Sequence, residues 1–142
     1  MNTMLIDSDR LGEIDVDEGS VIDFPDGILG FPDRHKYAMV SAEDQGVYTW
    51  LQAVDDPKLA FLAVVPTAFF PEFSPNIPDE ECIAIGLSDP NDAQLLSLVT
   101  VTDSGVTANL LGPIVLNVRT RLARQVVLAD PDLSTRTPII PG

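Results

Sequence analysis

The chain has 142 residues, with 22 acidic and eight basic side chains and a formal net charge of −14 at neutral pH. A chain of this length buries about 70% of its unfolded surface, so we expect one domain over residues 1–142 with its own core. The acidic excess disfavours contact with the phosphate backbone of nucleic acids, and it would instead attract a basic protein. Acid that serves only solubility would give the same composition.

The sequence contains a single cysteine, Cys82, which excludes an intramolecular disulfide. Its first seven residues lack the basic and apolar regions of a signal peptide, and no apolar run approaches the roughly 20 residues that span a membrane. We therefore expect a cytoplasmic protein that does not bind a membrane.

Alternating polar and apolar residues predict short strands in the first half of the chain. Residues 12–16 and 20–24 are expected to form a hairpin around a turn at residues 17–19. Residues 24–32 are rich in proline, glycine and apolar side chains, which predicts a loop that folds back over the core. Strands are expected next at residues 36–41 and 47–54.

Residues 59–65 are apolar on both faces, which predicts a strand in the middle of the fold. A short helical turn is expected to start at Pro66, because proline suits the first turn of a helix. Three phenylalanines follow within five residues. We expect Phe69 to pack in the core, whereas Phe70 and Phe73 fit either core packing or a partner-binding patch.

The second half of the chain is also read as strands and turns. Residues 79–81 predict a solvated acidic loop, residues 82–87 a strand, and residues 95–101 a second strand buried on both faces. Residues 106–110 and 114–117 predict two strands that meet at a rigid corner at Gly112 and Pro113, and residues 122–128 predict another strand. Leu133 is expected to pack, while the tail at residues 131–142 is expected to be partly frayed.

About ten short strands with one or two short helical turns make this an all-β protein. We predict a small, closed or nearly closed antiparallel β-barrel, because closure removes the exposed strand edges that promote aggregation.

The residue types that carry catalysis or bind metals are scarce in this sequence. His35 is the only histidine and Cys82 the only cysteine, so a zinc site with three or four nitrogen and sulfur ligands cannot be assembled. Cys82 is expected to be a small buried residue of a strand, and His35 a surface residue. Asp55 and Asp56 are expected to form a turn rather than a carboxylate pair. We predict no catalytic residue, no metal, no cofactor and no direct nucleic-acid binding.

Four segments resemble, in order, the FliW family of flagellar assembly factors. They are residues 22–31 (IDFPDGILGF), residues 51–61 (LQAVDDPKLAF), residues 66–73 (PTAFFPEF), and residues 107–117 (TANLLGPIVLN) together with residues 125–128 (QVVL). The sequence departs from the family pattern where Leu29 replaces Pro, Gly112 replaces Ala, Phe73 replaces Tyr and Arg124 replaces Lys.

The resemblance implies a non-enzymatic regulator of flagellin production that is a monomer on its own. Such a protein binds the translational repressor CsrA, relieves its repression of flagellin mRNA, and binds flagellin as the competing partner. CsrA holds RNA and is therefore basic, which agrees with the acidic charge of this chain. The predicted partner-binding residues are Phe70, Glu72, Phe73, Asp79, Glu80, Glu81, Asn109, Leu110, Pro113, Asn117 and Gln125.

Alternatives stay open for these residues and for the whole chain. Asn109, Asn117 and Gln125 could instead be structural amides that tie the corner to neighbouring strands. The chain could also be a homo-oligomeric structural or interaction protein that associates through its aromatic segment, or a small β-barrel enzyme with an unrecognised site.

Overall fold

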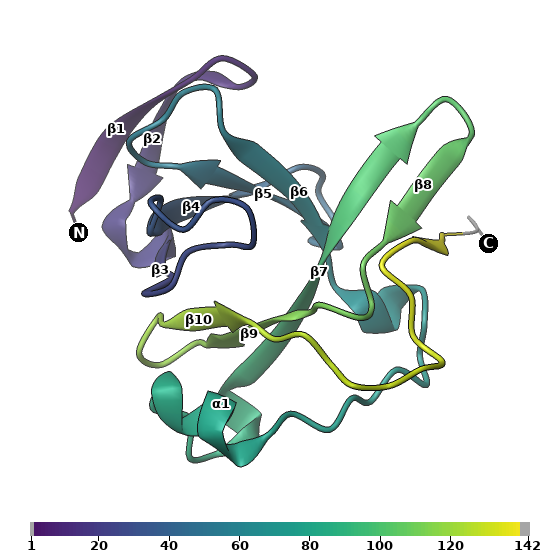
Figure 1. Ribbon diagram of the computed structural model, residues 1–142. Helices are drawn as coiled ribbons and strands as arrows, with labels where there is room; N and C mark the ends of the chain where they lie inside the picture. The colour runs from purple at the N-terminus through teal and green to yellow at the C-terminus, as the bar shows by residue number, and fades with distance from the viewer. Residues whose placement is uncertain (1, 140–142) are drawn as a thin grey trace.

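A computed structural model describes residues 2–139 and confirms an all-β protein (Figure 1). The described chain contains three short 3-10 helices, η1 (Glu18–Ser20), η2 (Pro66–Ala68) and η3 (Pro90–Asp92), and one α-helix, α1 (Asp79–Ala84). Its strands are β1 (Thr3–Ser8), β2 (Gly12–Asp17), β3 (Val21–Asp23), β4 (Lys36–Ser41), β5 (Tyr48–Ala53), β6 (Ala60–Val64), β7 (Ala93–Thr102), β8 (Gly105–Ala108), β9 (Ile114–Asn117), β10 (Ala123–Gln125) and β11 (Thr137–Pro138).

The main sheet curls until its two ends almost meet. Its antiparallel strands follow the order β10-β9-β7-β6-β5-β4-β3. At the open seam, Asp23 of β3 forms an isolated parallel bridge with Leu122, which directly precedes β10. The Asp23 amide also donates a hydrogen bond to the Arg121 carbonyl at 2.9 Å. The sheet is therefore a nearly closed barrel, as predicted, that leaves little strand edge open at the seam.

The long strand β7 connects the barrel to a projecting arm. Its first residues pair with β9, Ser97 and Leu98 pair with β6, and its last four residues pair with β8. β8 pairs in turn with the short β11. The β7–β8 hairpin therefore extends away from the barrel (Figure 1).

The barrel interior is the largest apolar cluster of the molecule. Side chains from β3, β4, β5, β6, β7, β9 and β10 fill it, and the Phe24 and Tyr37 rings meet edge to face at a centroid distance of 5.4 Å. The predicted loop at residues 24–32 contributes the buried Phe24 and Ile28. The same loop leaves Leu29 63% and Phe31 41% exposed, so only part of it covers the core. Two successive tight turns shape this loop, closed by Gly27 N–H to Phe24 C=O and Phe31 N–H to Ile28 C=O. The exposed Leu29 lies within the second turn, whereas the Phe31 ring still packs edge to face on Phe61 at a centroid distance of 5.3 Å.

Three smaller apolar clusters lie outside the barrel. The β1–β2 hairpin packs Ile6 and Val16 against Ala38 of β4. The segment after η2 and the C-terminal residues pack around Val64 and Leu110. The coils on either side of helix α1 pack Ile77, Ile85 and Leu87 on Val115 and Val126, on the outer side of β9. The barrel is therefore a scaffold whose outer face holds three attached segments.

The strands of the predicted N-terminal hairpin pair with other strands instead of with each other. Residues 12–16 and 20–24 do not pair with each other: β2 pairs with β1 from Thr3 to Ser8, and β3 pairs with β4. The prediction is wrong because η1 separates the two strands. The Asp17 carboxylate caps η1 by accepting the Gly19 amide at 2.9 Å, which turns the chain from the outer hairpin into the barrel.

Residues 79–87 form a helix and a coil rather than an acidic loop and a strand. Pro78 precedes α1, three acids fill its first turn, and Gly86 follows it with φ +68°. These are favourable helix start and stop residues, because the carboxylates interact well with the N-terminal end of the helix dipole and glycine adopts the left-handed conformation. Ile83 is consequently 76% exposed, and Cys82 is half-buried on the helix instead of buried in a strand.

The C-terminal part follows the predictions more closely. Strand β10 is shorter than expected, but the amides of Val126 and Leu128 still bond to the carbonyls of Pro113 and Leu111 at 2.9 and 2.8 Å. Leu133 packs as predicted. Residues 140–142 lie outside the described part, and the expected fraying of that end is not tested. Within residues 2–139, no helix has the length and apolar character to span a membrane.

Candidate functional site

The corner between β8 and β9 is held by two side-chain amides. Asn109 Oδ1 accepts the Gly112 amide at 2.8 Å, and Gln125 Nε2 donates to the Gly112 carbonyl at 3.1 Å. Gln125 Oε1 also accepts the Leu29 amide at 3.0 Å, which joins the corner to the exposed loop. A Cβ at position 112 would lie 3.1 Å from Asn109 Nδ2, so the glycine leaves room for this arrangement. Gln125 uses both its oxygen and its nitrogen, as the structural interpretation requires, whereas the bond of Asn109 Oδ1 stays within the corner itself.

Asn117 holds the other end of β9 and is fully buried. Its Nδ2 donates to the Ile85 carbonyl at 3.0 Å, just beyond α1, and its Oδ1 accepts the Arg119 amide at 3.0 Å. Leu110 and Pro113 are buried as well. These three predicted partner-binding residues present almost no surface in this conformation, and their part in binding stays a prediction.

The aromatic segment lies next to the projecting arm. The predicted helical turn at Pro66 is present as η2, and the Phe70 amide bonds to the Pro66 carbonyl at 2.8 Å. Phe69 packs as expected, with its ring 5.8 Å from that of Tyr48. Phe70 and Phe73 pack against the same cluster, all three rings are half-buried, and Glu72 is exposed. The segment therefore offers partly exposed rings beside an exposed carboxylate.

Arg124 brings together two segments that are far apart in the sequence. Its guanidinium pairs with Asp26 of the loop at residues 24–32 and with Glu81 of α1. Asp79 and Glu80 on the same helix are exposed. Sequence reasoning predicted the acids of α1 as binding residues, but it missed this ion-pair bridge and the exposure of Leu29 and Ile83. Pro78, the three acids and Gly86 indicated a helix at this position, and a helix would have predicted that Ile83 is exposed.

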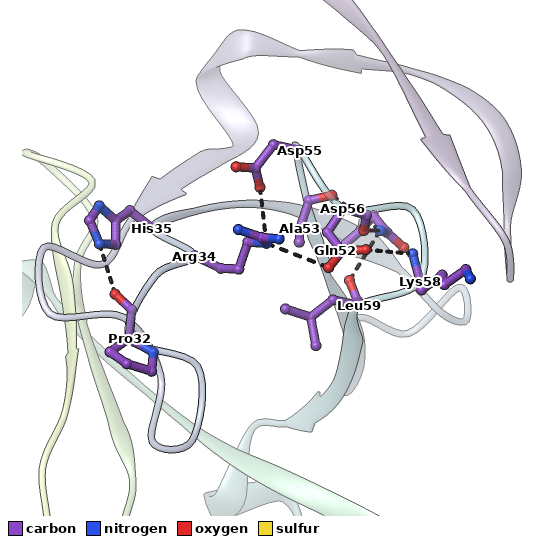
Figure 2. Close-up of polar contacts among 9 residues, drawn as sticks. All are labelled: Pro32, Arg34, His35, Gln52, Ala53, Asp55, Asp56, Lys58 and Leu59. Atoms are coloured by element: carbon purple, nitrogen blue, oxygen red, sulfur yellow. Dashed lines mark hydrogen bonds and ion pairs between the residues drawn. The ribbon is translucent and has the colours of Figure 1, made fainter.

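A polar cluster at one end of the barrel connects the loop before β4 with β5 and the turn before β6 (Figure 2). Arg34 lies between Asp55 and Asp56, with Nε–Oδ distances of 3.9 and 3.5 Å. The buried Gln52 donates from Nε2 to the Leu59 carbonyl at 3.1 Å, and its Oε1 accepts the Ser8 hydroxyl at 2.7 Å. Asp55 and Asp56 form the predicted turn, which is closed by the Leu59 amide on the Asp56 carbonyl, and Arg34 ties this turn to the loop before β4.

Two titratable side chains, Tyr37 and His35, lie near this cluster. Burial, with a smaller contribution from the Asp55 charge, raises the pKa of Tyr37 to about 12, so its hydroxyl stays protonated at neutral pH. His35 is exposed as predicted, and its Nε2 lies 2.9 Å from the Pro32 carbonyl oxygen (Figure 2). Across the described residues, no group of three or more His, Cys, Asp or Glu side chains could hold a metal ion.

Fold and surface together define a small, nearly closed β-barrel that carries its acids and exposed apolar side chains on attached segments. A family model described as "FliW protein" matches residues 5–139. The chain therefore belongs to the FliW family, as the four sequence segments indicated.

Relatives and a solved structure agree with this assignment. The "Flagellar assembly factor FliW" of Geotalea uraniireducens (strain Rf4) is 39% identical over 95% of this chain and 83% of its own length. The protein of the same name from Heliobacterium modesticaldum (strain ATCC 51547 / Ice1) is 36% identical over 98% of this chain and 92% of its own. A crystal structure of the flagellar assembly factor FliW superposes with a TM-score of 0.89 at 28% identity, over 98% of this chain and 99% of that one.

Proposed function

We propose that this protein acts in flagellar assembly by binding other proteins and not by catalysis. Its partners are the basic translational repressor CsrA, whose repression of flagellin mRNA it relieves, and flagellin, which competes with CsrA. Membership of a family whose relatives are named flagellar assembly factors is the observation that carries this proposal.

The charge of the chain supports a basic partner. The excess of 14 negative charges attracts a protein that must itself bind RNA phosphates, and it repels the RNA with which this protein would compete. Association should therefore be fast at low ionic strength and slower as salt is added, because screening shortens the range of the attraction.

The predicted binding residues divide by exposure into those that can contact a partner and those that hold the contacting segments in place. Phe70, Glu72, Phe73, Asp79 and Glu80 retain accessible surface, and we propose them as contacts, with the rings as apolar anchors and the carboxylates as the complement of basic side chains. The remaining residues would act by holding those segments in place. They are Glu81, Asn109, Leu110, Pro113, Asn117 and Gln125.

Size-exclusion chromatography tests the partners directly. The purified protein is mixed with CsrA, with flagellin, and with both, at low and at moderate ionic strength. We expect co-elution with each partner, weaker CsrA binding at the higher salt, and loss of CsrA from the complex when flagellin is added. Separate elution of all three proteins at low salt would refute the proposal.

Glu72→Lys tests the proposed contact surface. This change should lower the association rate with CsrA about tenfold, because it replaces attraction by repulsion in the aromatic segment, and it should leave the melting temperature nearly unchanged. The matched control is Asp15→Lys, the same charge change at an exposed position of β2, which lies across the barrel from this segment (Figure 1). Stopped-flow measurements that give equal losses for both variants would mean that only net charge matters.

A further inference from the structure

An apolar groove of about 560 Å³ lies between α1, the coil before it and the outer side of the barrel. Ile77, Leu87, Leu95 and Val115 form its walls together with Cys82 of α1. All of these except Val115 are only half-buried, so they keep apolar surface open to the groove. Asp79 is the only charged residue of its lining.

A second hollow, of about 410 Å³, adjoins the groove at Pro75, which lines both. Leu128 and Leu133 are the largest apolar side chains of its lining, and Asp130 is its only charged lining residue. The two hollows therefore repeat one pattern on either side of Pro75: aliphatic walls with a single carboxylate.

The part of the chain that lines the larger groove contains no basic side chain. Residues 59–118, which supply the whole lining of the larger groove, contain seven acids and no Lys, Arg or His. Two arginines from the following segment do reach this region. Arg124 is paired with Glu81 and Asp26, and Arg119 is paired with Asp92. An occupant of the groove therefore meets uncompensated carboxylates.

We propose that the two hollows bind one segment of a partner protein, which places aliphatic side chains on both sides of Pro75 and Lys or Arg beside Asp79 and Asp130. Aliphatic side chains fill such apolar pockets, and cations complement the carboxylates at the edges. A second copy of this chain is a poor occupant, since each copy carries a charge of −14. The identification of this segment with one of the flagellar partners rests on the proposed function. The preference of the groove for an aliphatic, basic segment rests only on its lining residues.

A pair of synthetic amphipathic peptides tests the groove on the full chain. The probe is a fluorescent peptide of sequence LKKLLKKLLKKL, and its control is LEELLEELLEEL, which has the same leucines and the opposite charge. Fluorescence anisotropy should show binding of the first peptide only. The bound peptide should also slow the alkylation of Cys82 by iodoacetamide, because this thiol lines the larger groove.

Variants locate the binding site. Asp79→Lys should weaken binding of the cationic peptide about fivefold, whereas Asp103→Lys, the same change at the tip of the β7–β8 hairpin, should weaken it less than twofold. Ala93→Trp should abolish binding by filling the groove from its edge, and its melting temperature shows whether it has folded. Equal binding of both peptides, equal loss in the two lysine variants, or wild-type affinity in Ala93→Trp would overturn the proposal.

The outcomes also separate this inference from the proposed function. If Ala93→Trp still co-elutes with CsrA and flagellin, those proteins bind elsewhere and the groove serves neither. If the cationic peptide binds while neither protein co-elutes, the groove is a binding site and the proposed flagellar partners are wrong.

Discussion

Gly27 lies at a turn that leaves no room for a side chain. Its φ is +72°, and a Cβ there would lie 2.5 Å from the Phe31 carbonyl oxygen and 2.7 Å from Pro32 Cα. Gly27→Ala should therefore lower the free energy of unfolding by about 3 kcal/mol, from backbone strain and a clash with backbone atoms that cannot move independently. Urea unfolding measures this difference.

Gly30 in the same loop is the matched control. Its φ is +89°, but nothing lies within 4 Å of the position of a Cβ. Gly30→Ala should therefore cost only the strain of the left-handed conformation, about 1 kcal/mol. Equal costs at the two positions would show that the close approach of Phe31 and Pro32 has no energetic effect.

At single positions, the sequence predicted that a side chain needs hydrogen bonds better than it predicted which groups provide them. An amide among apolar neighbours indicated that Asn109 and Asn117 need hydrogen bonds, and both have them. Asn109 bonds locally to the Gly112 amide, whereas Asn117 bonds to the distant Ile85 carbonyl, and no local pattern encodes that second contact. Phe70 and Phe73 illustrate a second limit, because a ring buried within a monomer and one buried at an interface have the same sequence.

Asn117 and the Thr120 hydroxyl both bond to the Ile85 carbonyl just after helix α1, at 3.0 and 3.1 Å. Asn117→Ala removes the bond to the Ile85 carbonyl and leaves the Arg119 and Thr120 amides without their side-chain acceptor. The variant should lose about 2 kcal/mol of unfolding free energy, because three hydrogen bonds of a buried side chain are lost. Alkylation of Cys82 should become faster as α1 loosens. The exposed Asn91→Ala should change neither quantity, and an Asn117→Ala variant with unchanged Cys82 reactivity would contradict this role.

The turn between β4 and β5 should weaken in acid. The Glu43 carboxylate accepts the amides of Gln45, Val47 and Tyr48, and the bonds from Tyr48 and Gln45 are the main causes that hold its pKa below the ordinary value. A lowered pKa adds stability above the unfolded-state pKa, and this stability is lost as the pH falls through the folded-state pKa. Glu43→Gln should therefore be less stable than the parent at neutral pH, and the difference should shrink in acid. Urea unfolding at both pH values tests this; a difference that persists in acid would contradict it.

At the level of elements, strands with clear alternation were predicted, while their pairing and the short helix were not. Residues 36–41 and 59–65 read as strands because alternation or a continuous apolar run is visible locally. The partner of β2 is not encoded in β2 itself, because either neighbouring strand satisfies its pattern. Residues 82–87 alternate by coincidence, and the capping residues around α1 were the stronger signal.

At the level of the whole molecule, barrel closure follows from general physics and strand order does not. Many short strands without long helices favour closure, since open edges invite aggregation. The path through β7, which pairs in turn with β9, β6 and β8, depends on long-range contacts that no segment specifies alone. The acidic charge, by contrast, is a property of the whole chain and can be read from composition directly.

That charge should make the protein more stable in salt. Four of the eight basic residues form ion pairs in the described structure, and screening weakens these attractions, each worth about 0–1 kcal/mol. Screening also weakens the mutual repulsion of the 14 excess negative charges, which is the larger effect. Raising the ionic strength from about 0.01 M to about 0.15 M shortens the screening length from about 30 Å to about 8 Å. We expect the melting temperature, measured by circular dichroism, to rise by about 4 °C.

A variant with fewer acids separates repulsion from other effects of salt. Glu13→Gln, Asp15→Asn, Asp44→Asn and Asp103→Asn together remove four exposed carboxylates, none of which forms an ion pair in the described structure. The combined variant should melt higher than the parent at low salt and gain less from added salt, because less repulsion is left to screen. A parent protein that melts lower in salt would mean that its ion pairs outweigh the repulsion between its excess acids.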